Sequence, residues 1–119
     1  MKKVILTAVT VAAAAASMNA QAVTAAVCSG GVSPQTVTSI ASAATSFIKT
    51  GFMPKCSANV ILHYDDQTTY MRVGSASVKG KNAFGGSTMG GAVSANASCA
   101  ATGCTATDVT TAVNAAASS

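Results

Sequence analysis

The sequence predicts an α+β fold in which one amphipathic helix packs on a small antiparallel sheet of three to four strands, with a short helix at the C-terminus. Three observations lead to this prediction: strand-like alternation between residues 56 and 84, helical spacing of apolar residues between 34 and 50, and a second helical pattern after Thr107. A period of two residues is typical of strands, and a spacing of three to four residues is typical of amphipathic helices.

Residues 1–22 have the composition of a secretory signal peptide. Lys2 and Lys3 precede an uncharged run from Val4 to Ala16, and the segment ends in Ala20-Gln21-Ala22. This order matches the basic, apolar and A-x-A regions of such signals. A transmembrane helix is the competing interpretation, but an apolar run of about 13 residues is too short to span a bilayer.

We therefore expect cleavage after Ala22 and a single small disulfide-stabilised domain over residues 23–119. A lipid anchor at Cys28 is an alternative, although Val27 is larger than the residue that lipoprotein processing prefers. The expected location is extracellular or at the cell surface, with periplasmic retention left open, and we expect no membrane insertion once the signal is removed.

The mature chain has few charges and few large apolar residues. Removing 22 residues from 119 leaves 97, with five basic residues against three aspartates and a formal charge of +2. The basic residues are dispersed without neighbouring aromatic platforms, so a nucleic acid partner is not expected. Leu, Ile, Val and Phe number only 17 of those 97 residues. Such a thin core favours additional stabilisation by disulfides or by association with other subunits.

The first half of the mature chain is expected to hold an extended segment and then a helix. Residues 23–32 suit a short strand or an extended arm. Ser33 and Pro34 form a helix-start signal, and residues 34–50 form the expected amphipathic helix, with Gly51 as its stop. Its apolar positions follow helical spacing, namely Val37, Ile40, Ala41, Ala44, Phe47 and Ile48.

The region from Cys56 to Val78 predicts a strand, a turn and a second strand. Val60, Leu62 and Tyr64 alternate with Asn59, Ile61 and His63. Asp65, Asp66 and Gln67 predict a turn, after which Thr69 to Val73 alternate again. A second turn is expected at residues 79–82, with Gly80 at positive φ, and a third strand would start at Ala83.

The remaining chain contains a glycine-rich segment and the C-terminal helix. Residues 85–94 have neither the lysine of a phosphate loop nor a GxSxG elbow, so they predict a flexible loop or a strand closely approached by another backbone. Thr107 is expected to cap the final helix, and Asp108 suits its first turn. The apolar face of this helix would be Val109, Ala112, Val113 and Ala116.

The mature chain contains four cysteines, Cys28, Cys56, Cys99 and Cys104. An even number in a secreted chain predicts disulfides, and three pairings are possible. We favour Cys28 with Cys56, which would tie the predicted helix across the first strand, and Cys99 with Cys104, which would close a small loop. A zinc site is the competing interpretation, but no CxxC spacing is present.

Catalytic, cofactor and metal sites are not expected. His63, the only histidine, would share a strand face with Asp65, so a weak metal site with Asp65 or Asp66, or a general base, is conceivable. One imidazole and two aspartates, in a chain without glutamate, are few ligands. A histidine at a strand end beside a polar turn is the simpler interpretation.

These features favour a secreted structural subunit that self-assembles into an extracellular or cell-surface fibre, with strand edges pairing between copies. Its main partner would be itself, and a surface component or the secretion machinery is a further candidate partner. The alternative is a small secreted binding module, an adhesin or inhibitor, that uses the glycine-rich loop and exposed Tyr64, Tyr70 or Arg72. An enzyme is the least favoured class, because no acid, base and nucleophile converge.

Overall fold

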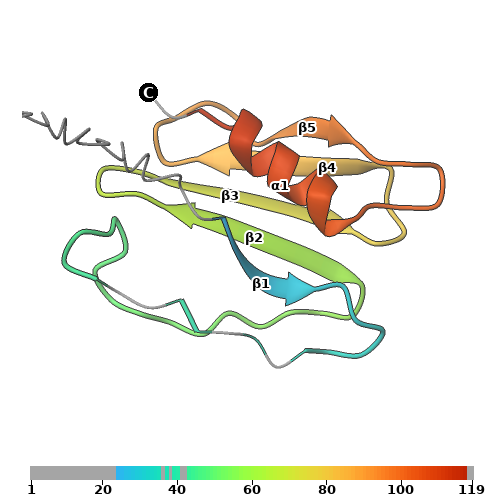
Figure 1. The fold of residues 1–119 in the computed structure, drawn as a ribbon, viewed down its shortest axis with the longest axis horizontal. Coiled ribbons are helices and arrows are strands. Elements are labelled where there is room, and N and C mark those ends of the chain that lie inside the picture. Colours follow the sequence, from blue (N-terminus) through green and yellow to red (C-terminus); the bar gives the residue numbers. More distant parts are fainter. Residues whose placement is uncertain (1–23, 36, 38, 41–42, 118–119) are drawn as a thin grey trace, which may run out of the picture.

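The computed structural model describes residues 24–35, 37, 39–40 and 43–117, and the predicted signal peptide lies outside these residues. The fold is α+β, with a five-stranded antiparallel sheet and a C-terminal helix that lies across one face of it (Figure 1). The sheet follows chain order, and each strand pairs with the next. The elements are β1 Ala25–Ser29, β2 Val60–Asp66, β3 Met71–Ser77, β4 Asn82–Ser87, β5 Ser94–Ser98 and α1 Ala106–Ala115.

The central strands β2 and β3 correspond to the predicted strand pair, but the turn between them lies further along the chain. Asp65 and Asp66 are the last residues of β2 and pair with Arg72 and Met71. The reversal follows, and the amide of Gln67 donates to the carbonyl of Tyr70 at 2.9 Å. The prediction of a turn at the aspartates was wrong because both carboxylates have partners outside the turn, as described below.

The hairpin between β3 and β4 also differs in detail from the prediction. The amide of Gly80 donates to the carbonyl of Ser77 at 2.8 Å. Positive φ among the described glycines occurs at Gly30, Gly90, Gly91 and Gly103 instead. Gly80 was therefore wrongly expected to need a left-handed conformation.

The sheet has five strands instead of three to four, because both uncertain segments are extended. Residues 25–29 form β1, which pairs with β2. Gly85 and Gly86 lie in β4, and the glycine-rich segment then turns and continues into β5. Glycine disfavours strands, so the extension of β4 through Gly85 and Gly86 does not follow from their own propensities. It follows from the neighbouring residues that approach them closely.

The predicted amphipathic helix over residues 34–50 is wrong. The described residues of this range form no helix, and isolated bridges pair Gln35 with Cys56 and Ile40 with Phe52. The sequence between Pro34 and Ile40 is rich in Ser, Thr and Val, which lose side-chain freedom in a helix or compete for its backbone hydrogen bonds. Tertiary packing instead buries Val37 and Ile40 in the core with Val27 and Cys28.

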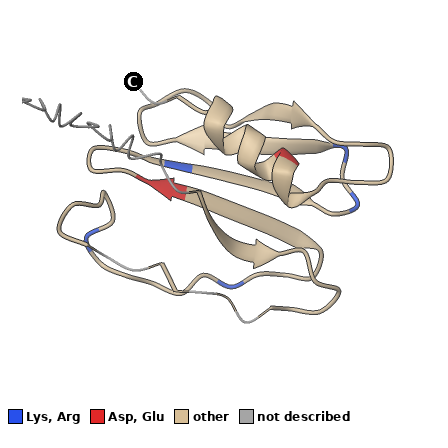
Figure 2. Ribbon diagram, viewed as in Figure 1, with Lys and Arg blue, Asp and Glu red and all other residues tan. Residues whose placement is uncertain are grey.

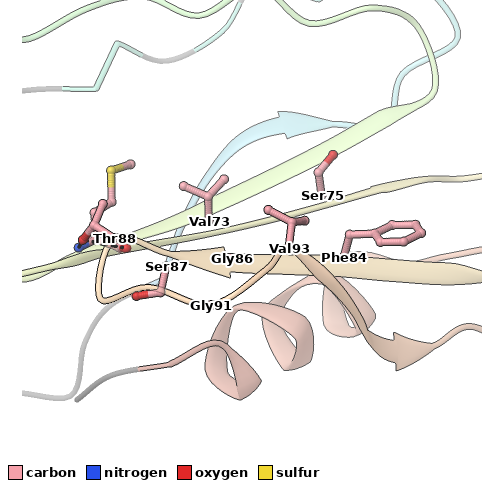
Figure 3. Close-up of a pocket in the computed structure, with 9 residues that line it drawn as sticks. Val73, Ser75, Phe84, Gly86, Ser87, Thr88, Gly91 and Val93 are labelled. Carbon is pink, nitrogen blue, oxygen red and sulfur yellow. Dashed lines mark hydrogen bonds between the residues drawn. The ribbon is translucent and has the colours of Figure 1, made fainter.

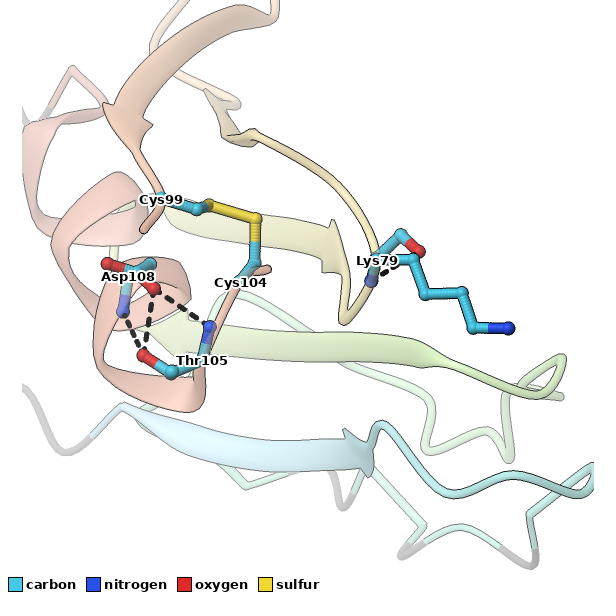
Figure 4. The surroundings of a disulfide bond; sticks show 6 residues. Lys79, Cys99, Cys104, Thr105 and Asp108 are labelled. Atoms are coloured by element: carbon cyan, nitrogen blue, oxygen red, sulfur yellow. Dashed lines mark hydrogen bonds between the residues drawn. A yellow bond between two sulfur atoms is a disulfide. The ribbon is translucent and has the colours of Figure 1, made fainter. Parts of the chain in front are cut away.

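Helix α1 begins two residues earlier than predicted. Thr105, and not Thr107, is the N-cap, and it forms a capping box with Asp108 (Figure 4). The Asp108 carboxylate accepts the Thr105 amide at 2.8 Å, and its own amide donates to the Thr105 hydroxyl at 3.4 Å. This reciprocal arrangement satisfies two amides that a helix start leaves unpaired. The predicted apolar face is buried, and its residues are Val109, Ala112, Val113 and Ala116.

The structure contains two disulfides, one in each half of the chain. Cys28 bonds to Cys56, and Cys99 bonds to Cys104 beside the start of α1 (Figure 4). These are the pairs that the sequence favours. The first disulfide ties the segment between β1 and β2 to the sheet, and the second fixes the chain just before α1.

The sheet separates two small cores. On one face, α1 packs over a cluster formed by Ile61, Ala76, Ala83, Cys104, Val109 and Ala112. On the other face, the segment between β1 and β2 packs over Val27 and Cys28, with Leu62 and Tyr64 partly buried against it. The predicted alternation of β2 is thus observed, since Ile61 and His63 point to the helix side and Leu62 and Tyr64 to the opposite side.

Two glycines let α1 lie close to the sheet. Gly74 and Gly85 are partners on neighbouring strands. A Cβ atom at Gly74 would lie 2.6 Å from Val113 Cγ2, and one at Gly85 would collide with the backbone carbonyl of Ala112. The close approach of the helix therefore requires glycine at both positions.

We predict that Gly85→Ala lowers the free energy of unfolding by about 1–3 kcal/mol, because the helix backbone must move away from the sheet. Gly86→Ala is the matched control on the same strand. Its Cβ would face the opposite side and meet the side chain of Val93, 2.8 Å away in an exposed loop that can shift. Urea denaturation of both variants measures the difference in the free energy of unfolding. Equal losses of stability would contradict the conclusion that the close approach of α1 requires Gly85.

Candidate functional site

The second face of the sheet is covered only in part by the described chain. The segment between β1 and β2 packs against β1 and β2, whereas the same face of β3 and β4 carries an apolar groove of about 280 Å³. The described residues that line it come from β3, β4 and the loop that follows β4 (Figure 3). The lining residues are Met71, Val73, Ser75, Phe84, Gly86, Ser87, Thr88, Gly91 and Val93.

Strand alternation explains why this groove is apolar. In β3, Arg72, Gly74 and Ala76 are buried on the helix side, so Met71, Val73 and Ser75 project to the opposite face. From β4, Phe84 projects to the same face and remains 47% exposed. Figure 3 shows Val73, Ser75 and Phe84 pointing away from α1. This face of β3 and β4 therefore presents large apolar side chains to solvent. The small residues of the same strands that are buried on the helix side are Gly74, Ala76, Ala83 and Gly85.

The loop after β4 forms one wall of the groove. Thr88 anchors it, because its amide donates to the Met71 carbonyl at 2.9 Å and its hydroxyl accepts the Met71 amide at 2.9 Å. Gly90 and Gly91 then reverse the chain at φ values of 110° and 85°. Val93 returns over Gly86 and is 72% exposed. The positive φ of the two glycines is the physical reason for the glycine-rich sequence here.

The chemistry of the lining is that of a contact surface. Among the described residues that line the groove, the polar side chains are the hydroxyls of Ser75, Ser87 and Thr88, and none is charged. The charged residues of the described chain are dispersed elsewhere, mainly on hairpin ends and the segment before β2 (Figure 2). Contiguous exposed apolar surfaces are where proteins and apolar ligands make contact, so this groove is the candidate site.

Two of the charged residues singled out from the sequence, Asp65 and Arg72, lie on the other face, beneath α1. Arg72 Nε donates to Asp65 Oδ2 at 2.9 Å, and Arg72 Nη2 donates to the same oxygen. Gln67 Nε2 donates to Asp65 Oδ1 at 2.6 Å. The Asp65 residue is 1% exposed. Arg72 also donates through Nη1 to the Asn114 carbonyl at 3.2 Å, so the ion pair joins β2 and β3 to the end of α1.

His63 and the two aspartates do not form one cluster. His63 Nδ1 lies 3.0 Å from the Thr110 hydroxyl, and burial lowers the pKa of its imidazole. Asp65 is on the same face, as predicted, but pairs with Arg72. Asp66 is on the opposite face, where its carboxylate accepts the amide of Phe47 at 2.7 Å. Within the described part of the chain, no three His, Cys, Asp or Glu residues are placed to hold a metal ion.

The binding-module hypothesis named three exposed residues, and the structure corrects two of them. Arg72 is buried with Asp65, and Tyr64 packs against the core beneath the segment between β1 and β2. Tyr70 is partly exposed, and the Arg72 guanidinium lies 5.7 Å from the centroid of its ring. This placement is typical of a cation–π contact.

Comparisons with protein-family models, with curated proteins and with solved structures find no match. We therefore infer function from the structure of this chain alone. Its two disulfides are consistent with a secreted protein. Among the described residues, no helix combines the length and hydropathy needed to cross a bilayer.

The sequence pattern places Met71, Val73 and Phe84 in strands but did not predict the groove. Met71 and Val73 alternate visibly with Arg72 and Gly74, and this was the available signal. The helix predicted over residues 34–50 was expected to cover the sheet, which hid the possibility of an open face. Only the observed path of that segment, over β1 and β2, shows that β3 and β4 remain uncovered.

Proposed function

We propose that the protein is a secreted structural subunit, without enzymatic activity, that self-associates into an extracellular or cell-surface assembly through the groove on β3 and β4. The charge-free apolar lining of this groove carries the proposal. In an isologous contact between identical copies, a residue on the twofold axis meets its own copy, so a charge at that position would face the same charge. A surface without charge avoids this repulsion.

The edges of the sheet are less suited to assembly than the groove. Both β1 and β5 have five residues, and each carries one extra residue relative to its partner strand. The extra residues are Val27, between partners Ala26 and Cys28, and Asn96, between partners Ala95 and Ala97. Short, bulged edge strands resist pairing with another chain. We therefore place the contact on the sheet face and not on the strand edges that the sequence favoured.

A non-enzymatic role is supported by what surrounds the groove hydroxyls. Ser75, Ser87 and Thr88 line it, but neither a histidine nor a carboxylate does. A nucleophilic hydroxyl requires an adjacent base. His63, the only histidine of the chain, contacts Thr110 on the other side of the sheet.

The second candidate is a monomeric binding module that captures an apolar segment of another protein in the same groove. The concavity of the site favours it, because recognition grooves for peptides and small ligands are concave and mostly apolar. Oligomeric state separates the two candidates, since only a subunit of an assembly associates with itself.

We predict that Val93→Lys weakens self-association at least about tenfold, a change equivalent to about 1.4 kcal/mol, by placing a charge in the apolar contact. Sedimentation velocity over a range of concentrations, on oxidised mature protein, measures this. Val32→Lys is the matched control, because Val32 is 88% exposed and lies outside the groove.

Two results would overturn the proposal. Wild-type protein that stays monomeric at every concentration, including material recovered from the native surface, excludes the structural subunit and leaves the binding module. Equal weakening by both lysine substitutions would show that association does not use the groove.

A further inference from the structure

Polar contacts hold α1 on the sheet from Thr110 to the end of the helix. His63 Nδ1 lies 3.0 Å from Thr110 Oγ1, Asn96 Nδ2 donates to the Ala112 carbonyl at 3.3 Å, and Arg72 Nη1 donates to the Asn114 carbonyl at 3.2 Å. The apolar contacts of the helix come from the buried Val109, Ala112, Val113 and Ala116, which are small side chains above a sheet that includes two glycines. The polar contacts therefore add to a small apolar interface in holding the helix on the sheet.

His63 is the contact that can change charge near neutral pH. It is buried between β2 and α1, and its hydrogen-bond partner on the helix is a neutral hydroxyl. Of the described elements around it, β1, β4 and β5 contain no charged residue. The remaining elements carry Asp65 and Asp66 on β2, Arg72 on β3 and Asp108 on α1, and of these Asp66 projects to the opposite face of the sheet.

None of the charged groups near His63 is a free counter-ion. Asp65 is paired with Arg72 and also accepts a hydrogen bond from Gln67. The Asp108 carboxylate accepts the amide and the hydroxyl of Thr105 at the helix start. A proton on His63 would therefore add a buried positive charge beside an ion pair that is already neutral. Such a charge is costly unless it is paired or exposed to water.

We propose that α1 is a pH-sensitive cover, whose C-terminal half loosens from the sheet when His63 becomes protonated. The Cys99–Cys104 disulfide and the capping box keep the start of the helix in place, so the movement is a partial opening. Opening exposes the imidazole to water and allows it to carry its proton. The proposal is independent of the groove and of self-association.

The direction of the pH effect follows from linkage. Burial lowers the pKa of His63 below the ordinary value of 6.5. At a pH above 6.5 the imidazole is neutral whether the helix is closed or open, so the helix docks at full strength. As the pH falls below 6.5, the open state binds a proton that the closed state does not, and docking weakens until the pH passes the pKa of the closed state. The ratio of open to closed helix increases by up to tenfold for each unit by which the pKa of His63 in the closed state lies below its pKa in the open state.

Two NMR measurements on the oxidised mature protein test this inference. The chain has one histidine, so a single imidazole signal reports its pKa directly. Amide exchange at pH 7.5 and 5.0, corrected for the intrinsic pH dependence, then compares residues 109–115 with β2 and β3. We expect a His63 pKa below 6.5 and a selective loss of protection in α1 at pH 5.0.

His63→Gln provides the control, since glutamine can hydrogen-bond to Thr110 but does not titrate in this range. We expect its α1 protection to be the same at both pH values. A wild-type His63 pKa at or above 6.5 would overturn the proposal, and this result does not depend on whether the variant folds. A loss of α1 protection at pH 5.0 that is equal in wild type and His63→Gln would overturn it as well.

Discussion

Arg72→Met is expected to lower the free energy of unfolding by about 3–5 kcal/mol, because it leaves the Asp65 carboxylate buried without its counter-charge. Asp65 is almost fully buried, and both interactions that Arg72 makes with it end at Oδ2. The substitution also removes the hydrogen bond from Arg72 to the Asn114 carbonyl, so the end of α1 loses a partner. Urea denaturation followed by circular dichroism measures the loss.

The double variant Asp65→Leu with Arg72→Met is the decisive control. Replacing both members of a buried ion pair by apolar residues of similar size is often close to neutral, whereas removing one member is costly. We therefore expect the double variant to recover most of the stability lost in the single one. A double variant as unstable as Arg72→Met, or a single variant as stable as the wild type, would contradict the assignment of the pair as buried and mutually dependent.

The second large effect is expected from removal of the Cys28–Cys56 disulfide. Replacing both cysteines by serine should destabilise the fold by about 3.5 kcal/mol, because the bridge closes a long loop in the unfolded chain. The two cysteines are 28 residues apart. The structure adds a local consequence: the segment between β1 and β2 has little regular structure, and both cysteines belong to the core beneath it. Its packing on Leu62 and Tyr64 should loosen first.

The Cys99–Cys104 pair gives a matched comparison. These residues are only 5 apart, so loss of that bridge should cost less, about 2 kcal/mol by the same loop-length relation. Thermal unfolding of the two double serine variants ranks the effects, and amide exchange locates them. The first variant should lose protection near Ile40 and Phe52, the second at the start of α1. Equal melting temperatures for both variants and the wild type would refute a stabilising role for the disulfides.

Much of the sheet was predictable because its signals are local. Ile61 and His63 alternate with Leu62 and Tyr64, and this pattern places them on opposite faces whatever the rest of the chain does. The C-terminal helix was predictable for the same reason, since its apolar spacing and Asp108 lie within three turns. Its cap was misplaced by two residues, because Thr105 and Thr107 offer the same side chain and only the backbone geometry chooses between them.

The failures involve residues whose partners are distant in sequence. Asp65 and Asp66 were interpreted as a turn, yet their carboxylates bind Arg72 and the amides of Phe47 and Ile48. The predicted helix over residues 34–50 failed because Val37 and Ile40, which satisfy helical spacing, are buried in the core by an irregular segment. Periodicity alone cannot distinguish a helix from such a segment when tertiary contacts outweigh local preference.

The sequence by itself determined the α+β class, the alternation of the central strands, the final helix and a pair of disulfides that suits a secreted chain. These depend on neighbours within a few residues, or on the chemistry of cysteine. The tertiary structure decided where the segment after β1 lies, how closely α1 approaches Gly74 and Gly85, and which sheet face stays open. The reason is physical: coverage of a face depends on the packing of segments far apart in the chain, which no local pattern encodes.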